Sequence, residues 1–169
     1  MNKNDADLGA LYRETVMDHY RSPRGHKILD RIDIMREGHN PVCGDKVKLS
    51  VKMSDEGVED VAVDCKGCAI SVASASMLAE LLPGKSKADI ERLDEAFREM
   101  MHGKPMPDDL DLGDLDALEG VQKFPVRIKC ALLAWMTMLE ALRDAGNGPE
   151  AKNEVTSTEK QGEKAHAGH

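Results

Sequence analysis

Two neighbouring segments of the chain alternate between apolar and polar residues, and together they predict an antiparallel β-hairpin. In residues 46–53, four apolar side chains alternate with lysine and serine. Residues 60–65 resume the alternation after the turn sequence S-D-E-G at residues 54–57. A period of two is typical of a strand with one buried and one solvated face. Because hairpin strands run antiparallel, the second strand is expected to end near the start of the first.

Helical periods and one further strand pattern complete the expected secondary structure. Apolar residues that recur at i, i+3 and i+4 indicate amphipathic helices. The predictions are helices over residues 8–21, 69–82 and 87–101, a helix that begins near Pro125, and a strand over residues 31–38. Asp7 is the expected N-cap of the first helix. The helix from Pro125 is apolar on two faces and is therefore expected to be buried.

Together these elements predict an α+β fold. It consists of a small antiparallel three-stranded sheet with helices packed on it and a buried C-terminal helix. The predicted domain covers residues 1–145, and the acidic residues 103–120 are expected to form a solvated loop within it. Residues 146–169 are expected to be disordered, because they contain no aromatic residue and are rich in Glu, Lys and Gly. His166 and His169 are interpreted as incidental, or alternatively as a loose metal-binding end.

Charge and terminal sequence narrow the range of partners. The formal net charge of −8 argues against nucleic acid or an anionic membrane as the main partner. No apolar run is long enough to span a bilayer, and the first residues lack the apolar segment of a signal peptide. We therefore expect a cytoplasmic protein that acts as a monomer. In that compartment, four cysteines favour metal ligands or reactive thiols over disulfides.

Three cysteines and one aspartate are expected to gather at one end of the predicted hairpin. The motif N-P-V-C-G-D at residues 40–45 places Cys43 and Asp45 two positions apart, so that an extended backbone would point both side chains to one side. The hairpin returns Cys68, at the start of a helix, toward Cys43. Cys130 lies in the second turn of the last predicted helix.

The residue types in this group leave several kinds of chemistry open. Three thiolates with one carboxylate suit tetrahedral zinc, and thiolates also suit an iron–sulfur cluster. Alternatively, the cysteines pack as small hydrophobic residues. Cys65 forms a C-x-x-C pair with Cys68, a spacing found in redox-active sites. Because Cys65 continues the buried parity of Val61 and Val63, we predict that it is a packing residue.

Three motifs of the chain resemble the U-type iron–sulfur cluster assembly family. They are N-P-V-C-G-D at residues 40–45, G-C-A-I-S with A-S-A-S at residues 67–76, and F-P-V-R-I-K-C at residues 124–130. The similarity is strongest to the SufU branch. The scaffold branch, IscU, carries a histidine immediately before its last cysteine, where this chain has Lys129. SufU-type proteins also share the extended segment that separates the last two motifs.

The resemblance implies a zinc site made by Cys43, Asp45, Cys68 and Cys130. It further implies a sulfurtransferase-like role, in which Cys43 accepts sulfur from a persulfide of a SufS-type cysteine desulfurase and a downstream iron–sulfur assembly scaffold receives it. The position of Cys43 in a loop beside a glycine also favours it as the mobile thiol. Arg127, one helical turn before Cys130, is expected to stabilise the anionic site, or else to form only a surface ion pair.

Two alternative functions remain open from the sequence. One is an iron–sulfur cluster assembly scaffold that binds a 2Fe–2S cluster or iron in place of zinc. The other is a structural zinc-binding interaction module with no chemistry of its own. The scaffold differs from the other two in its metal, and the interaction module differs from the sulfurtransferase in the consequence of losing Cys43.

Overall fold

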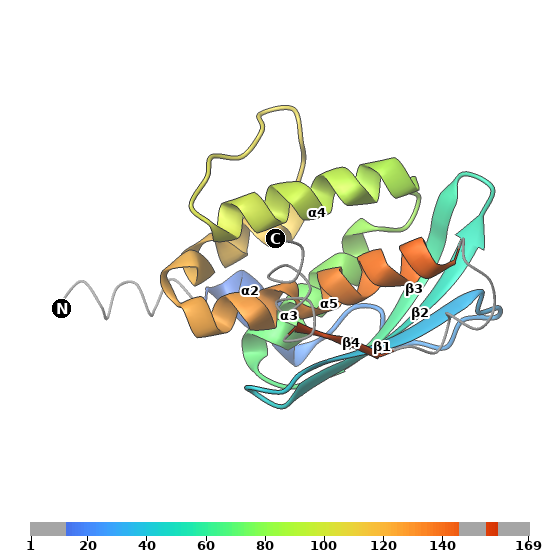
Figure 1. The fold of residues 1–169 in the computed structure, drawn as a ribbon, viewed down its shortest axis with the longest axis horizontal. Coiled ribbons are helices and arrows are strands. Elements are labelled where there is room, and N and C mark those ends of the chain that lie inside the picture. The colour runs from blue at the N-terminus through green and yellow to red at the C-terminus, as the bar shows by residue number, and fades with distance from the viewer. Residues whose placement is uncertain (1–12, 146–154, 159–169) are drawn as a thin grey trace, which may run out of the picture.

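The computed structural model describes residues 13–145 and 155–158. Its elements, in chain order, are α2 (Glu14–Arg21), β1 (Ile34–Asn40), β2 (Asp45–Ser54), β3 (Gly57–Lys66), α3 (Ala69–Leu81), α4 (Lys87–Met101), the 3-10 helix η1 (Gly113–Lys123), α5 (Pro125–Asp144) and β4 (Val155–Ser157). The predicted α+β fold is confirmed, because an antiparallel sheet of β1, β2 and β3 carries helices on one face (Figure 1).

The sheet has the strand order β3-β2-β1-β4. β2 and β3 form the predicted hairpin, in which Lys46 lies opposite Lys66 and a bulge follows Lys52. β1 pairs antiparallel with β2, and Asn40 lies opposite Asp45 where that second hairpin closes. Both hairpins therefore bring chain segments to the same end of the sheet.

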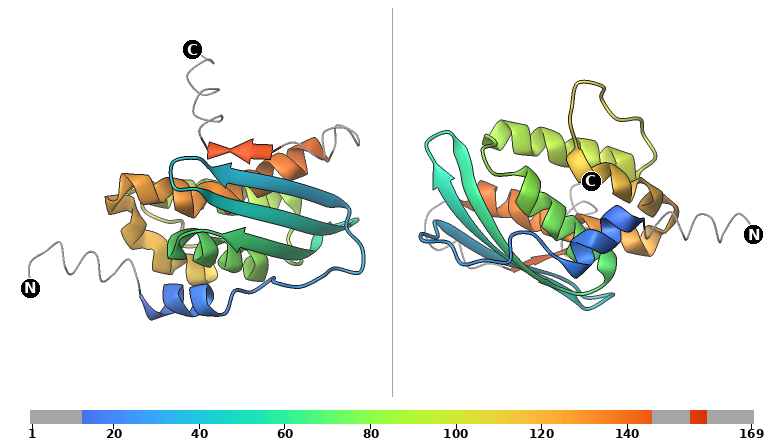
Figure 2. Two further views of the ribbon diagram at one scale, coloured as in Figure 1. Left: turned by 90° about the horizontal axis from the view of Figure 1, so that it is seen from below. Right: turned by 180° about the vertical axis from the view of Figure 1, so that it is seen from behind.

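The helices form two layers over the sheet, as the views in Figure 2 show. α3 packs on β3, and α5 packs on β1 and β2. α4 lies outside them and packs on α5, where the rings of Phe97 and Trp135 are 5.6 Å apart between centroids. Trp135 is fully buried, which confirms that the last helix belongs to the core. Among the described helices, none is long and apolar enough to cross a bilayer.

The acidic segment before α5 differs from its prediction as a solvated loop. Residues 113–123 form η1, and its side chains Leu115, Leu118 and Val121 are fully buried against the helices. These three residues recur every third position, which is the period of a 3-10 helix. The carboxylates around them are exposed. The acidic composition of the segment therefore suggested a solvated loop, although the segment contains a buried apolar stripe.

The ends of the predicted elements shift in three places. The strand predicted for residues 31–38 runs from Ile34 to Asn40, because Asn40 still pairs with β2. The first helix is described from Glu14, so Asp7 lies outside the described residues. Within the tail predicted to be disordered, β4 pairs in parallel with residues 37–39 of β1, while His166 and His169 lie outside the described residues.

Candidate metal centre

The loop between β1 and β2 carries the first two candidate ligands. The Asn40 side-chain oxygen accepts a hydrogen bond from the Val42 N–H at 3.2 Å, and the Asn40 carbonyl accepts one from the Gly44 N–H at 2.8 Å. Gly44 has a φ of +74°, a conformation that glycine adopts without steric penalty. This turn leaves Cys43 partly exposed and buries Asp45 at the first position of β2.

The junction between β3 and α3 brings Cys68 to the same place. Its backbone N–H donates to Asp45 Oδ1 at 3.0 Å, and its sulfur lies 3.8 Å from Asp45 Oδ2. Gly67 allows this approach, because a Cβ atom at that position would lie 2.2 Å from Asp45 Oδ1. The hairpin topology therefore returns Cys68 to the Cys43 loop, as the sequence predicted.

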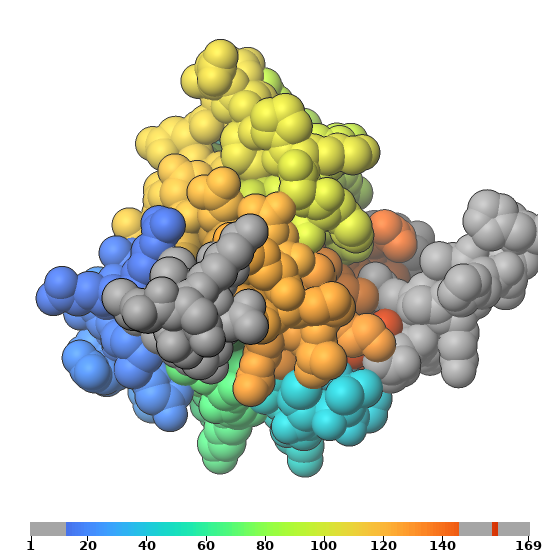
Figure 3. Space-filling model, turned by 90° about the vertical axis from the view of Figure 1, so that its left-hand side faces the viewer, coloured from blue at the N-terminus to red at the C-terminus, as the bar shows by residue number. Residues whose placement is uncertain are grey.

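The first turns of α5 contribute Cys130, which is fully buried. Its sulfur lies 3.7 Å from the sulfur of Cys43 and 3.8 Å from the carbonyl oxygen of Val126. Figure 3 views this end of the molecule, where the cyan β1–β2 loop, the green start of α3 and the orange start of α5 adjoin. Three separate segments of the chain thus converge on one point.

The spacing of these side chains fits a tetrahedral zinc ion. Ligand atoms of Cys43, Asp45 and Cys130 all lie within 4.8 Å of one another. The sulfur of Cys68 lies 3.8 Å from Asp45 Oδ2 but is not within 4.8 Å of every atom of that group. Zinc–sulfur bonds of 2.3 Å in a tetrahedron separate two sulfurs by about 3.8 Å. The observed distance of 3.7 Å between Cys43 and Cys130 agrees with that value. The donor set of three sulfurs and one oxygen also suits zinc.

Hydrogen bonds favour the charged forms of Asp45 and Cys68 at this site. Burial alone would raise the pKa of the Asp45 carboxyl, but hydrogen bonds from the Ser71 hydroxyl and the Cys68 N–H outweigh burial and lower that pKa. A side-chain hydrogen bond with Cys130 is the main cause that lowers the pKa of the Cys68 thiol to about 6. The pKa of Cys130 is raised, first by Cys68 and then by burial. Metal binding displaces the protons that remain on the thiols of this pair.

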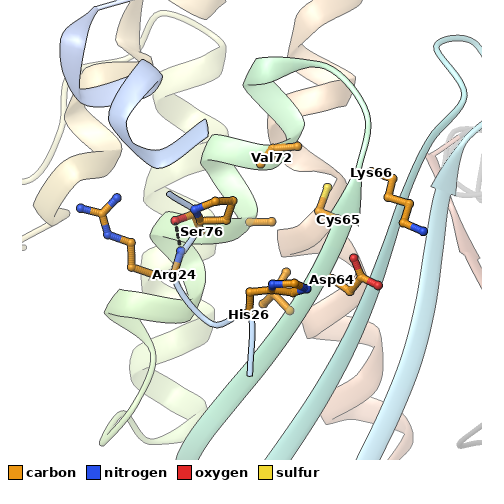
Figure 4. Close-up of a pocket in the computed structure, with 10 residues that line it drawn as sticks. Arg24, His26, Asp64, Cys65, Lys66, Val72 and Ser76 are labelled. Atoms are coloured by element: carbon orange, nitrogen blue, oxygen red, sulfur yellow. Dashed lines mark hydrogen bonds between the residues drawn. The ribbon is translucent and has the colours of Figure 1, made fainter. Parts of the chain in front are cut away.

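Cys65 stands apart from the group of ligands. Burial raises the pKa of its thiol to about 12, so it is protonated and a weak nucleophile at neutral pH. It lines a pocket of about 270 Å3 with Val72, Asp64 and His26, and its sulfur points toward Val72 (Figure 4). The prediction that Cys65 is a packing residue agrees with its place at the edge of the hydrophobic core.

Arg127 and Lys129 occupy the first two turns of α5. Arg127 is half-buried and lies one helical turn before Cys130, so it shares a face of the helix with that ligand. Lys129 is exposed on another face. Each of the two side chains has an interaction partner in the protein. The role of Arg127 in stabilising the anionic site stays a prediction.

A second group of His and carboxylate side chains lies between α2, α3 and η1. His19 is fully buried and contacts Ser76 Oγ and Asp114 Oδ2, each at 2.7 Å, and Glu80 completes the group. Arg24 lies 3.4 Å from Glu80, so a cation already faces these carboxylates. We interpret the group as a hydrogen-bonded and ionic network that fixes α2 against its neighbours.

The sequence did not reveal several residues that shape the candidate metal centre. The Ser71 hydroxyl, for example, donates a hydrogen bond to Asp45 Oδ2 at 2.6 Å. Gly67 provides space for Asp45, and the Asn40 side chain reaches the sulfur of Cys130. A serine one turn into a helix that begins with a candidate ligand was the available signal for Ser71.

Comparison with known proteins places the chain among iron–sulfur assembly proteins. The NifU-like N-terminal domain matches residues 11–143. The chain is 42% identical to the zinc-dependent sulfurtransferase SufU of Bacillus subtilis strain 168, over 85% of this chain and 98% of that protein. It is 41% identical to the iron–sulfur cluster assembly scaffold protein IscU of Streptococcus pyogenes serotype M1, over 83% of this chain and 87% of that protein.

Solved structures show the same relationship. A candidate iron–sulfur cluster assembly scaffold protein for the SUF system from Fervidobacterium islandicum AW-1 superposes with a TM-score of 0.73 at 32% identity, over 79% of this chain and 98% of that one. The domain match covers more than three quarters of the chain and includes all four candidate ligands. The chain therefore belongs to the family defined by the NifU-like N-terminal domain.

Proposed function

We propose that the chain is a zinc-dependent sulfurtransferase that accepts persulfide sulfur from a SufS-type cysteine desulfurase for iron–sulfur cluster assembly. The observation that carries this proposal is the group of Cys43, Asp45 and Cys130 at zinc-like separations, with the sulfur of Cys68 beside Asp45. Cys43 lies in the β1–β2 loop, whereas Cys68 is the N-cap residue of α3 and Cys130 lies within α5. The relative in Bacillus subtilis is named for this activity, which supports the proposal.

A second candidate function is an iron–sulfur cluster assembly scaffold. It is favoured by the relatives named IscU, at 41% identity and below. The histidine that precedes the last cysteine in the scaffold branch is replaced here by the exposed Lys129. A lysine at neutral pH carries a proton and cannot ligate a metal ion without losing it. The donor set therefore favours zinc-dependent sulfur transfer over cluster assembly.

Cys43, Asp45, Cys68 and Cys130 would hold the zinc, and zinc bound there keeps the thiolates deprotonated at neutral pH. The Cys43 thiolate attacks the outer sulfur of the desulfurase persulfide, so that the sulfur–sulfur bond of the donor breaks and its cysteine thiolate leaves. Cys43 then carries the transferred sulfur as a persulfide. Asp45, Cys68 and Cys130 remain buried or half-buried and keep the site assembled.

The surface around Cys43 suits a protein partner. Val42, in the β1–β2 loop, is 60% exposed, and Val126, in the first turn of α5, is 57% exposed. Exposed apolar residues beside a reactive group favour a protein contact that excludes water. We infer that the desulfurase docks here and that Arg127 offsets the negative charge of the site. The domain is proposed to act as a cytoplasmic monomer that passes sulfur to a downstream scaffold, without nucleic acid or membrane.

The test combines metal analysis with sulfur transfer. Protein purified in air should contain about one zinc per chain and no visible chromophore. With a SufS-type desulfurase and cysteine, Cys43→Ser should accept no sulfur, whereas Cys65→Ser should accept it at the wild-type rate. Mass spectrometry of the Cys43 peptide detects the added sulfur.

Two results would reject the proposal in different ways. A brown protein with acid-labile sulfide would support the scaffold function. Unchanged stimulation of the desulfurase by Cys43→Ser, together with a lower melting temperature, would support a zinc-stabilised interaction module instead.

A further inference from the structure

Asn40 is a buried polar residue that contacts the candidate metal centre at two places and the C-terminal segment at a third. It is fully inaccessible to solvent, at the last position of β1. Its side-chain nitrogen lies 3.7 Å from the sulfur of Cys130. Its side-chain oxygen accepts hydrogen bonds from the Val42 N–H at 3.2 Å and from the Thr158 hydroxyl at 3.3 Å. The Asn40 amide therefore joins a zinc ligand, the Cys43 loop and the C-terminal segment.

The orientation of this amide follows from its partners. The backbone N–H of Val42 can only donate a hydrogen bond, so the side-chain oxygen of Asn40 must face it. The side-chain NH2 group then faces the sulfur of Cys130. A hydroxyl from Thr158 on the same oxygen polarises the amide further and makes its N–H a stronger donor.

A hydrogen bond to a thiolate withdraws charge from its sulfur, and a sulfur with less charge is a weaker nucleophile. Among the hydrogen bonds found for the described residues, Cys130 receives this one from Asn40, and Cys43 receives none from an N–H group. The two sulfurs lie only 3.7 Å apart, and Cys130 is fully buried whereas Cys43 is partly exposed. Once a persulfide has reached Cys43, a lower nucleophilicity of Cys130 would add to the protection that burial gives it.

We propose that Asn40 is a positioning residue that selects Cys43 as the sulfur acceptor by making Cys130 a weak nucleophile. The segment Val155–Thr158 supports it through the hydroxyl of Thr158. This inference rests on the proposed sulfurtransferase function. It assigns to Asn40 the choice between two adjacent thiolates of one zinc site.

The C-terminal segment is an addition to the family domain, which matches residues 11–143 only. β4 pairs with residues 37–39 of β1, directly before Asn40. Thr158 follows β4 and is 5% exposed. Residues 155–158 thus reach Asn40 from the edge of the sheet, through the Thr158 hydroxyl.

The test uses the full-length, zinc-loaded protein and iodoacetamide, a small electrophile. The rates of modification of Cys43 and Cys130 are measured separately by mass spectrometry of their peptides. Asn40→Asp keeps the oxygen that Val42 and Thr158 require, but it replaces the donor by a second oxygen. The ratio of the Cys43 rate to the Cys130 rate should fall by about fivefold, which corresponds to a hydrogen bond of about 1 kcal/mol.

Two further variants address the C-terminal segment. Thr158→Val removes one hydroxyl at a distance from the metal and should lower the same ratio by a smaller factor, whereas Thr158→Ser should retain it. Cadmium-113 NMR of the cadmium-loaded protein gives a second readout, because the resonance responds to charge on the coordinating sulfurs. Asn40→Asp and Thr158→Val should shift the resonance in the same direction.

An unchanged ratio in Asn40→Asp would show that burial alone protects Cys130 and would overturn the inference. An unchanged ratio and resonance in Thr158→Val would overturn the part assigned to the tail. Either result leaves the proposed function intact if the wild-type protein binds zinc and accepts sulfur on Cys43. Failure of the function itself would appear as wild-type protein without zinc.

Discussion

Asp45 combines two roles at the residue scale, as a candidate ligand and as a hydrogen-bond acceptor. It is 1% exposed and accepts from the Ser71 hydroxyl and the Cys68 N–H. A carboxylate binds zinc less strongly than a thiolate does, so it adjusts ligand release more than affinity. We therefore expect Asp45→Ala to retain zinc on its three cysteines. In this variant, zinc should bind Cys43 more tightly and release it less readily.

Sulfur acceptance by Asp45→Ala should fall roughly 10- to 100-fold, the range typical of groups that tune metal ligands. Zinc content and persulfide formation on Cys43 are measured on the same sample. Anaerobic reconstitution with iron and sulfide supplies the decisive control. A stable coloured cluster in the variant, with zinc easily displaced, would favour the scaffold function.

Two glycines at the candidate metal centre are required for different physical reasons, and alanine substitutions separate them. A Cβ at Gly67 would lie 2.2 Å from Asp45 Oδ1, so Gly67→Ala should displace the carboxylate and weaken zinc binding. Gly44 has open space around it but a positive φ of 74°, so Gly44→Ala should retain zinc and lose about 1 kcal/mol of stability. Competition with a zinc chelator and urea unfolding measure the two effects. Equal zinc affinities in both variants would contradict the steric role of Gly67.

At the scale of elements, ion pairs of Arg36 connect β1 to the C-terminal half of α5. Its side chain is 3% exposed and pairs with Glu140 and Asp144, which lie one helical turn apart. Arg36→Met leaves two poorly solvated carboxylates without this cation and should lower the free energy of unfolding by about 3 kcal/mol. The control is Arg92→Ala, which breaks an exposed ion pair with Asp109. It should change the free energy of unfolding by less than about 1 kcal/mol. Similar losses in urea unfolding would contradict this assignment.

Asp94 makes the packing of α4 sensitive to pH. Burial raises the pKa of its carboxyl, although Arg98 opposes the shift, and one carboxyl oxygen has no hydrogen-bond partner among the described residues. Because the folded state holds this proton more tightly than the unfolded state, the contribution of Asp94 to stability is complete below the pKa of the unfolded state. It is lost as the pH rises through the raised pKa.

Asp94→Asn removes this titration while keeping the shape of the side chain. The stability of the wild type relative to the variant should therefore decrease as the pH rises from about 4, by about 1.4 kcal/mol for each unit of pKa shift. Urea unfolding at several pH values measures the difference. A constant difference, or one that grows in favour of the wild type with pH, would contradict the prediction.

At the scale of the whole molecule, the metal centre links three segments that are far apart in the sequence. Zinc bound there would join the β1–β2 loop, the start of α3 and α5 in the native state only. Free zinc at a concentration of 100 times its dissociation constant would raise the free energy of unfolding by about 2.7 kcal/mol. Its removal by a chelator should lower the melting temperature by about 5 °C or more for a domain of this size. An unchanged melting temperature in protein shown to be zinc-free would contradict this role.

Much of the fold was predictable because local patterns specified it. The hairpin of β2 and β3 and the start of α5 at Pro125 agree with their sequence signals. α4 runs over the residues predicted, and the Ser86 side chain caps its first turn. η1 was missed because its acidic residues outnumber its buried leucines. The segment was therefore interpreted from its charge, and the three-residue spacing of its apolar side chains was overlooked. β4 was missed because its pairing depends on an edge of β1 that a local pattern does not reveal.

The sequence by itself determined the β2–β3 hairpin, the starts of α3, α4 and α5, the family resemblance and the approach of Cys68 to Cys43, because these follow from local alternation and helix signals. Only the tertiary structure decided the distance from Cys43 to Cys130, 87 positions away, since that depends on how α5 docks on the sheet. The same holds for the contacts of Ser71 with Asp45 and of Thr158 with Asn40, which span 26 and 118 positions. Hydrogen bonds to buried ligands require ångström-scale placement of separate segments, and that placement comes from packing of the whole core.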